Sequence, residues 1–406
     1  MRVACYYPWL YLCSGAERTI LEVALRSRHE WTVYTNHFAP AGTFPGFAKV
    51  PVRELSRISV KRSYLQAAKA AATMLLQRLP ANEHEVLMVH SEGLGDLVTF
   101  RNHSKPVLCY CHTPLKVIHD PYARDEYLKR NPAKAPMLSV FGGVFRFVDR
   151  LAWKRYSFIL ANSQTVRARI LEAGLAKEER IEVLHPGVDC TEIVPGARFD
   201  KYFLAVARIK WWKNIELSIE AFKRFRASTP MSSDFRLIVA GQVDDGSVGY
   251  FKKLQALART CAGVEFVPNP SRSRLDALYS SCYAAVNTTL NEDWGIVPIE
   301  VNAYAKPVIA VNRGGPTESQ ADGQTGFLVP AEPEAFARAM AVLAADEQLA
   351  RTMGRAGRKR ARRYDWSHFV NRIDDVVEEM AKSGGGRPFP AAAEPAQEHE
   401  PASMVA

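Results

Sequence analysis

The stretch KYFLAVARIKWWKNIELSIEAFKRF (residues 201–225) decides the architecture of the chain. Residues 202–207 form an apolar run of the length of a buried strand, and from residue 215 the apolar positions recur at helical spacing. A strand followed by a helix is half of a right-handed βαβ unit, in which successive strands run parallel. The loop over residues 208–214 therefore lies at the carboxyl end of a strand.

The same alternation of short apolar runs and helix-like segments extends over almost the whole chain. Further strand-like runs are RVACYY (2–7), EVLMVHS (85–91), PVLCYCHT (106–113), FRLIVAG (235–241) and AAVNTT (284–289). Strands separated by helices predict parallel sheets, and 406 residues exceed what one core usually holds. We therefore predict an α/β protein of two doubly wound, Rossmann-like domains.

Turn-forming residues that follow a predicted strand place the domain boundary near residues 194–198. We expect a first domain over residues 1–195 and a second over 196–364. A C-terminal amphipathic helix over 365–383 follows, with packing back on the first domain as one option. Residues 384–406 are rich in Gly, Pro, Ala and Glu without apolar periodicity, so we expect a disordered tail.

The composition is that of an ordinary globular protein, with 47% hydrophobic and 24% charged residues. No run reaches the roughly 18 apolar residues of a membrane span, and Met1 precedes a strand-like run rather than a signal peptide. Seven scattered cysteines favour a reducing cytoplasm. Cys109 and Cys111, two apart on a predicted strand, suit buried thiols better than a zinc site.

The net charge of +10 is unevenly distributed, because residues 1–195 carry +8 and residues 196–406 carry +2. A basic first half suits nucleic acid, an anionic membrane surface or a phosphorylated acceptor, and equally a solubilising surface. Residues 61–78 have basic ends and an apolar middle, as interfacial helices do, although packing against a sheet explains the same pattern. No zinc-finger, KH or RRM pattern accompanies the charge, so we expect no nucleic-acid partner.

In doubly wound sheets ligands bind at the carboxyl ends of the strands, and two loops there carry polar side chains. The loop in AVARIKWWKN (205–214) contains Arg208 and Lys213. A fork-shaped guanidinium and a compact ammonium together neutralise a diphosphate. The alternative to a phosphate site is that these charges are ordinary solvated side chains of the loop.

The second loop begins NEDWGIVPIE (291–300). Pro298 suits the first position of a helix, so we predict a helix from about residue 297 to 305. Glu292 then lies in the loop before this helix and Glu300 in its first turn. The two acids therefore do not share one solvated helix face.

The residues between the two glutamates favour an anion. Gly295 lets a ligand approach the backbone closely, and the free N–H groups of Gly295, Ile296 and Val297 point beyond the start of the helix. Carboxylates beside an anion site suit a ligand that also carries sugar hydroxyls. A diphosphate joining two sugars is such a ligand.

Together these motifs resemble those of glycosyltransferase family 4, the retaining enzymes of GT-B fold, in which two Rossmann-like domains face each other across a cleft. AVARIKWWKN resembles the family's R-x4-K phosphate motif, and NEDWGIVPIE with the later DGQTGFLV resembles its donor site. In the first half SGAER (14–18), YCHTP (110–114), ANS (161–163) and HPGVD (185–189) fall where the family has similar runs. Ser14 stands where the family has a glycine.

The resemblance implies a role for each charged residue of the two motifs. Arg208 and Lys213 would bind the donor diphosphate. Glu300 would hold the nucleotide ribose, and Glu292 the hydroxyls of the transferred sugar. With His112 near the anomeric centre, Glu292, Arg208 and Lys213 form the implied catalytic set, and neither a metal nor a cofactor is needed.

The resemblance also implies contacts through the backbone. Gly295, Ile296 and Val297 would donate N–H groups to the sugar and phosphate, and Gly15 would let the first loop approach the diphosphate and the acceptor. His112 also fits a merely hydrogen-bonded histidine at a strand end. Two further histidines, His90 and His185, are expected to be structural, the latter in a turn at the hinge.

The sequences NEDWGIVPIE and YCHTPLKVIHDPY are similar to the corresponding motifs of mannosyltransferases of lipid-linked oligosaccharide and bacterial polysaccharide synthesis. We therefore expect transfer of mannose from GDP-mannose to a hydroxyl of a lipid-linked or polysaccharide acceptor, in the cytoplasm or at the inner face of the membrane. A UDP-sugar donor stays open, as do an epimerase and a phosphorylase of the same fold. A basic nucleic-acid-binding protein is the alternative from another class.

Overall fold

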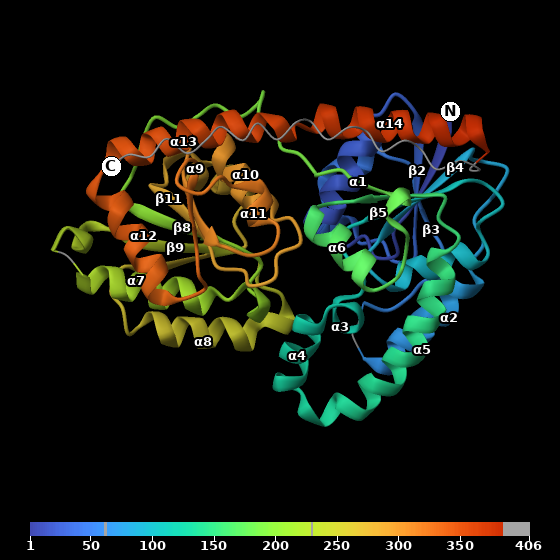
Figure 1. Cartoon of the computed structure of the whole chain (residues 1–406), viewed down its shortest axis with the longest axis horizontal. Coiled ribbons are helices and arrows are strands. Elements are labelled where there is room, and N and C mark those ends of the chain that lie inside the picture. Colours follow the sequence, from blue (N-terminus) through green and yellow to red (C-terminus); the bar gives the residue numbers. More distant parts are fainter. Residues whose placement is uncertain (61–62, 229, 385–406) are drawn as a thin grey trace.

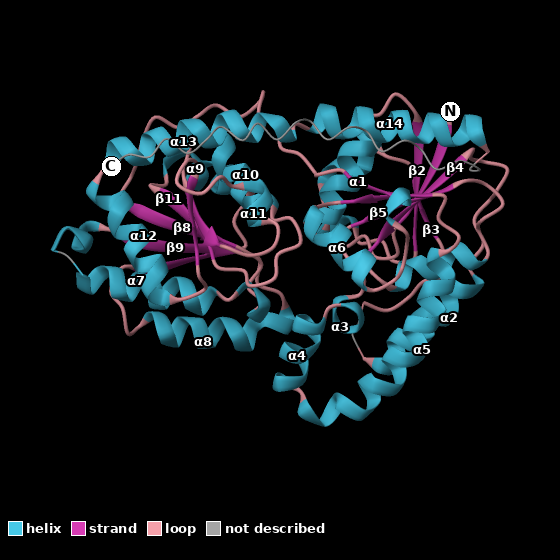
Figure 2. Ribbon diagram, viewed as in Figure 1, coloured by secondary structure: helices cyan, strands magenta, loops and turns pink. Residues whose placement is uncertain are grey.

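Two parallel sheets, each with helices on both faces, lie side by side along the long axis of the molecule (Figures 1 and 2). The structure is a computed structural model that describes residues 1–60, 63–228 and 230–384. From residue 385 onward the expected tail lies outside the described residues. The prediction of two doubly wound units is confirmed.

The first sheet has seven strands in the order β3-β2-β1-β4-β5-β6-β7. They are β1 (Arg2–Tyr6), β2 (Glu30–Thr35), β3 (Val52–Glu54), β4 (Val86–Ser91), β5 (Val107–Cys111), β6 (Phe158–Ala161) and β7 (Ile181–Val183). The order reverses between β1 and β4, so the loops after these strands leave the sheet on opposite sides. A ligand site belongs at this point.

The helices of the first domain follow its strands. They are α1 (Gly15–Arg26), α2 (Tyr64–Leu76), α3 (Lys116–His119), α4 (Pro121–Arg130), α5 (Ala135–Trp153) and α6 (Gln164–Glu172). α1 covers one face of the sheet, while α5 and α6 contribute Trp153, Val166 and Ile170 to the core on the other. Cys109 and Cys111 are fully buried thiols of β5, as predicted.

The second sheet has six strands in the order β10-β9-β8-β11-β12-β13. They are β8 (Tyr202–Val206), β9 (Arg236–Gly241), β10 (Val264–Pro268), β11 (Ala284–Asn287), β12 (Val308–Val311) and β13 (Gly326–Val329). Its helices are α7 (Ile215–Ser228), α8 (Val248–Ala258), α9 (Arg272–Ser281), α10 (Ile296–Ala303), α11 (Pro316–Ser319), α12 (Pro333–Ala345) and α13 (Glu347–Ala361). Here the order reverses between β8 and β11, the two strands followed by the two predicted donor-site motifs.

The helix after NEDWG differs slightly from the prediction. α10 begins at Ile296, one residue early, so Pro298 is its third residue rather than its first and Glu300 its fifth. Proline is tolerated there because the N–H groups of the first helical turn have no intrahelical partner. The helix ends at Ala303 rather than 305, because Ala305 has a φ of +57°, which no α-helix continues.

The last helix, α14 (Trp366–Ser383), returns from the second domain to the first (Figure 1). Its buried residues share one core with Val3 of β1 and Ile20 of α1. The two segments that cross between the domains contact each other, since the Val188 N–H donates to the Tyr364 carbonyl at 2.7 Å. A Cβ on Gly187 would lie 2.6 Å from that carbonyl oxygen, so only glycine fits.

No helix in the described part of the chain is long and apolar enough to cross a bilayer. The segment that the sequence suggested as an interfacial helix forms α2, whose Ala70 and Met74 are buried. Residues 61–62, at its basic start, lie outside the described residues.

Truncating Trp366 should destabilise the first domain. This side chain is 2% exposed and packs in the core beneath α14, so Trp366→Ala should lower the free energy of unfolding by about 3–5 kcal/mol. Urea unfolding followed by far-UV circular dichroism measures the change. The matched control is His368→Ala, an exposed position of the same helix, and an equal loss in both variants would contradict the proposed packing.

Candidate active site

The loops at the carboxyl ends of the two sheets meet at the domain boundary. Lys116, at the start of α3, places Nζ 2.8 Å from Oδ2 of Asp293 and 2.9 Å from the carbonyl oxygen of Asn291, both in the loop after β11. NEDWG therefore faces the first domain.

Lys213 and Glu292 form an ion pair across the second sheet's reversal point. Lys213 ends a short 3-10 turn after β8, and its Nζ lies 2.5 Å from Oε2 of Glu292. Both side chains are about one-sixth exposed (17% and 16%). Burial alone would raise the pKa of Glu292, but Lys213 and then Lys116 outweigh it and lower the pKa below its ordinary value of 4.5. Glu292 is therefore ionised at neutral pH.

Arg208 is half-buried in the same loop as Lys213. Among the described residues it has no hydrogen bond or ion pair, yet its charge acts on Glu17 and Tyr7 of the first domain. A guanidinium with all its donors unpaired, close to the facing domain, is suited to an anion bound between the domains.

Gly295 is the N-cap of α10 and has a φ of +79°. A Cβ there would also lie 2.8 Å from Cγ of Glu292, so a larger residue would strain the backbone and displace the Glu292 side chain. The side chains of Ile296 and Val297 pack against apolar clusters, Ile296 against the first domain's core and Val297 against the second's. The backbone N–H groups at the start of α10 have no intrahelical partner and are available to a ligand.

Glu300 has partners of its own. Oε2 accepts a hydrogen bond from the Tyr279 hydroxyl at 2.9 Å, and Oε1 lies 3.3 Å from Nη1 of Arg272. Within the described residues no hydrogen bond joins Glu300 to the Lys213–Glu292 pair. The structure thus brings Lys213 and Glu292 into contact and holds Glu300 separately, on the following helix.

His112 is buried directly after β5. Its backbone N–H donates to the Ser91 carbonyl at 3.0 Å, and its ring Nε2 lies 3.0 Å from Nδ1 of His90. Burial lowers the pKa of both imidazoles, so one neutral ring donates to the other. His90 is therefore the support that orients His112.

Gly15 is the first residue of α1. A Cβ at this position would meet no atom within 4 Å, so packing within the chain does not require glycine there. Two residues on, Glu17 is buried, which raises its pKa to about 7 although it accepts a hydrogen bond from Ser14. The start of α1 thus combines open space with a carboxyl group that titrates near neutrality.

His185 is more than a turn residue. Its Nε2 lies 3.0 Å from Oε2 of Glu318, and its ring centroid lies 4.1 Å from that of Trp294. Glu318 also accepts the N–H groups of Gln164 and Thr165 at the start of α6, at 2.7 and 2.9 Å. The sequence offered no signal for this second link between the domains.

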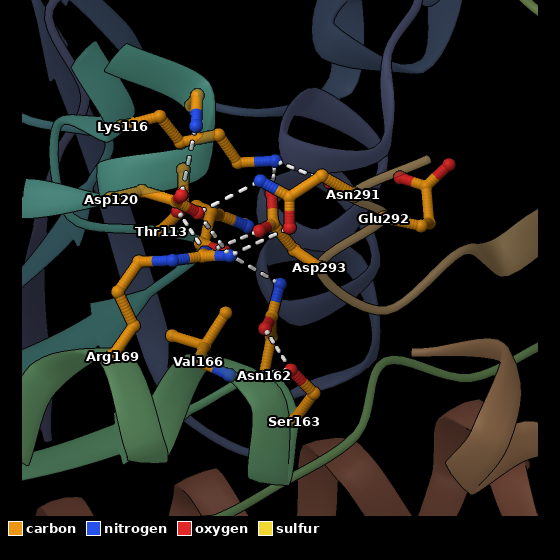
Figure 3. A network of polar contacts seen from close by, with 12 residues as sticks. Thr113, Lys116, Asp120, Asn162, Ser163, Val166, Arg169, Asn291, Glu292 and Asp293 are labelled. Atoms are coloured by element: carbon orange, nitrogen blue, oxygen red, sulfur yellow. Dashed lines mark hydrogen bonds and ion pairs between the residues drawn. The ribbon is translucent and has the colours of Figure 1, made fainter. Parts of the chain in front are cut away.

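A buried arginine on α6 organises the boundary (Figure 3). The guanidinium of Arg169, 7% exposed, pairs with Asp120 of its own domain at 2.9 Å and with Asp293 of the other. It also donates to Asn291 Oδ1 at 3.3 Å, and Asn291 donates in turn to Asp120 at 2.8 Å. Sequence reasoning assigned these four residues no role, although Asn291 and Asp293 flank Glu292 in the quoted motif.

The arrangement matches solved glycosyltransferases in fold. The TM-score is 0.72 with HepE of Anabaena in complex with UDP, covering 93% of this chain and 100% of that one at 18% identity. With sucrose-phosphate synthase of Thermosynechococcus elongatus it is 0.73, covering 94% and 100% at 18% identity. Two facing doubly wound sheets of this kind define the GT-B fold.

The sequence comparisons give the family. The model "Glycosyltransferase Family 4" matches residues 13–192, and "Glycosyl transferases group 1" matches residues 196–360. The chain belongs to glycosyltransferase family 4, and it is a retaining glycosyltransferase.

Its curated relatives include enzymes with different named activities. It is 28% identical over 384 residues to an alpha-1,3/1,6-mannosyltransferase of Homo sapiens, covering 86% of this chain and 88% of the relative. It is also 28% identical over 347 residues to a D-inositol 3-phosphate glycosyltransferase of Kribbella flavida, covering 80% and 78%.

Replacing Arg169 with methionine should weaken the domain boundary. The change leaves Asp120 and Asp293 without their shared cation, so the free energy of unfolding should fall by about 3–5 kcal/mol. The matched control is Arg167→Met on the same helix, whose partner Glu178 is 71% exposed and which should cost less than about 1 kcal/mol. Urea unfolding that gives equal losses for both variants would contradict the network's importance.

The Lys213–Glu292 pair should make stability depend on pH. A carboxyl whose pKa is lowered in the folded state contributes stability above its ordinary pKa of 4.5 and loses it as pH falls through the folded value. The destabilisation caused by Lys213→Met should therefore be largest near about pH 7 and shrink below about pH 4.

Thermal unfolding across this pH range measures the effect. Lys201→Met, which removes an exposed pair with Asp234, serves as the control and should change little at any pH. A pH-independent loss in Lys213→Met would argue against an ionised Glu292.

Proposed function

We propose that the chain transfers mannose from GDP-mannose to a hydroxyl of a lipid-linked or polysaccharide acceptor, with retention at the anomeric carbon. The observation that supports the donor site is the Lys213–Glu292 pair in a loop that also holds Arg208, a cation with no hydrogen bond or ion pair among the described residues. The choice of mannose is supported by the similarity to the human mannosyltransferase over most of both chains.

Arg208 and Lys213 stabilise the leaving group. Breaking the anomeric C–O bond leaves negative charge on the diphosphate and positive charge on the sugar. The guanidinium N–H groups of Arg208 can all donate to that anion. Lys213 donates one hydrogen bond to Glu292 and has further N–H donors for the diphosphate. These groups and the first N–H groups of α10 are held before the reaction, so they stabilise the developing charge without reorganising.

Glu292 and Glu300 accept hydrogen bonds from hydroxyl groups of the donor. Glu292 is ionised and accepts from the transferred sugar, while Glu300, fixed by Tyr279 and Arg272, accepts from the ribose. His112 is neutral and offers a hydrogen bond near the anomeric carbon without adding charge. Fixed partners of this kind hold the donor in a reactive geometry.

The scheme requires no protein nucleophile. The acceptor hydroxyl attacks the anomeric carbon from the side of the leaving group, forming the new C–O bond as the bond to phosphate breaks. The hydroxyl proton passes to the leaving phosphate oxygen, which balances the step. Configuration is retained because both bonds lie on one face.

A UDP-sugar donor is the second candidate. It is supported by the fold neighbour from Anabaena, whose structures hold UDP and UDP-glucose. For the chain itself we propose a place in the cytoplasm or at the inner face of the membrane.

The donor assignment predicts a selective thermal shift. GDP at about 100 times its Kd should stabilise the protein by about 2.7 kcal/mol, seen as a rise of a few degrees, while UDP and ADP should have little effect. Arg208→Ala should abolish the GDP shift. The control is Lys210→Ala, in the same loop but paired with Asp244 at 2.6 Å, which should keep the shift.

Each other outcome is informative. A shift with UDP alone keeps the transferase and replaces mannose with another sugar. A GDP shift that survives Arg208→Ala moves the diphosphate away from this loop. Mass spectrometry of products formed from GDP-mannose and a lipid-linked saccharide then tests transfer directly.

A further inference from the structure

An apolar stripe on α5 faces outward. Of the twelve large hydrophobic residues that are exposed in the described chain, five lie on this helix: Met137, Val140, Phe141, Val144 and Phe147, with exposures of 42–69%. Their spacing of three and four residues places them on one side of the helix. The opposite side carries Leu138 and Ala152, which are buried against the domain. Both sides of α5 are therefore apolar, and only one is covered.

The start of α2 extends the stripe. The Tyr64 ring lies 5.7 Å from that of Phe141, between centroids, and the adjacent Leu65 is 64% exposed. α2 and α5 lie side by side on the outside of the first domain (Figure 1). The apolar surface thus spans two helices.

The charge of the protein is concentrated in the same two helical regions. Residues 57–78 and 121–155 together carry 13 Lys and Arg and 3 Asp and Glu, a net charge of +10 that equals that of the whole chain. The rest of the sequence is therefore neutral overall. Along α5 and at its end, Arg146, Arg150 and Lys154 follow at intervals of four residues, forming a basic row beside the apolar stripe.

A large apolar stripe beside a basic row has the chemistry of an interfacial helix. Nucleic acid would use the charge but would leave aliphatic side chains such as Val140 and Val144 uncovered. A second copy of the chain would bring two regions of +10 together. An anionic membrane matches both features, since acyl chains take the apolar side chains and acidic headgroups the cations.

We propose that α5 lies in the surface of an anionic membrane, with Val144 and Phe147 among the side chains that enter the acyl boundary. The placement suits the site, because α4, which precedes α5, holds Arg130 with its guanidinium 4.3 Å from the ring centroid of Trp211 in the phosphate-motif loop. The membrane-facing helices thus adjoin the loops where a lipid-linked acceptor would meet the donor. The proposal concerns binding and does not depend on which sugar is transferred.

Vesicle flotation of the full chain, without any donor, tests the apolar stripe. The protein should float with phosphatidylcholine vesicles that contain phosphatidylglycerol and bind pure phosphatidylcholine far more weakly. Val144→Asp combined with Phe147→Asp should reduce partitioning by about tenfold or more, because each apolar side chain contributes to insertion. The control is Val342→Asp, 46% exposed on α12 of the second domain, which should bind as the wild type does.

The charge is tested separately. Lys134→Glu combined with Lys154→Glu should reduce binding to the anionic vesicles by at least about fivefold, since each basic residue near the surface contributes. Lys252→Glu combined with Lys253→Glu, two exposed positions on α8, changes the net charge equally and should leave binding intact. The charge variants keep the test informative even if the aspartate variants fold poorly.

Several results would overturn the proposal. One is that the protein floats with neither kind of vesicle. Another is that the α8 or α12 control variants lose as much vesicle binding as the α5 variants. A third is salt-sensitive binding that Val144→Asp and Phe147→Asp do not change, which would instead indicate a nucleic-acid site. A dimer that these variants convert to monomers, without vesicle binding, would assign the stripe to a second copy. The GDP-induced thermal shift should persist in all membrane variants, so that failure here is distinct from failure of the donor assignment.

Discussion

The burial of one guanidinium at the domain boundary constrains the rest of the site. A buried cation must find anions within reach, and Arg169 finds one on each side, in Asp120 and Asp293. Because Asp293 belongs to the loop after β11, satisfying the arginine fixes that loop against the first domain. Glu292 is the preceding residue, and its pairing with Lys213 extends the constraint to the loop after β8. The need to pair one buried cation thus positions side chains at α3 and α6 and in the loops after β8 and β11.

The electrostatics of the site divide into satisfied and unsatisfied groups. Glu292, Glu300 and Lys213 have partners, which hold these side chains in place. Arg208 has none among the described residues, although it lies close enough to influence Glu17 and Tyr7 across the boundary. A site that holds its carboxylates rigidly and leaves one cation free is prepared for an anionic leaving group attached to a polar sugar.

Local patterns in the sequence suffice for the sheets and for the two loops of the donor site, because strand and helix periodicities are properties of neighbouring residues. They miss Arg169, whose partners in NED lie more than 120 positions away and come together only when the domains dock. They single out residues 61–78, which include α2, as a possible interfacial helix and do not single out α5. Periodicity reports that α5 is apolar, but which side the sheet covers depends on tertiary packing, so the stripe over Val140 and Val144 emerges only from the fold.

The return of α14 to the first sheet has a consequence for synthesis on the ribosome. Strands and helices of the second domain end at Ala361, so that domain is complete before the ribosome has made the helix that covers Val3 and Ile20. At 5–20 residues per second, about 20–70 s separate the emergence of Ile20 from that of Phe369. During that interval the first-made domain exposes an apolar face, and a chaperone that shields such faces would act on the beginning of the chain until its last helix arrives.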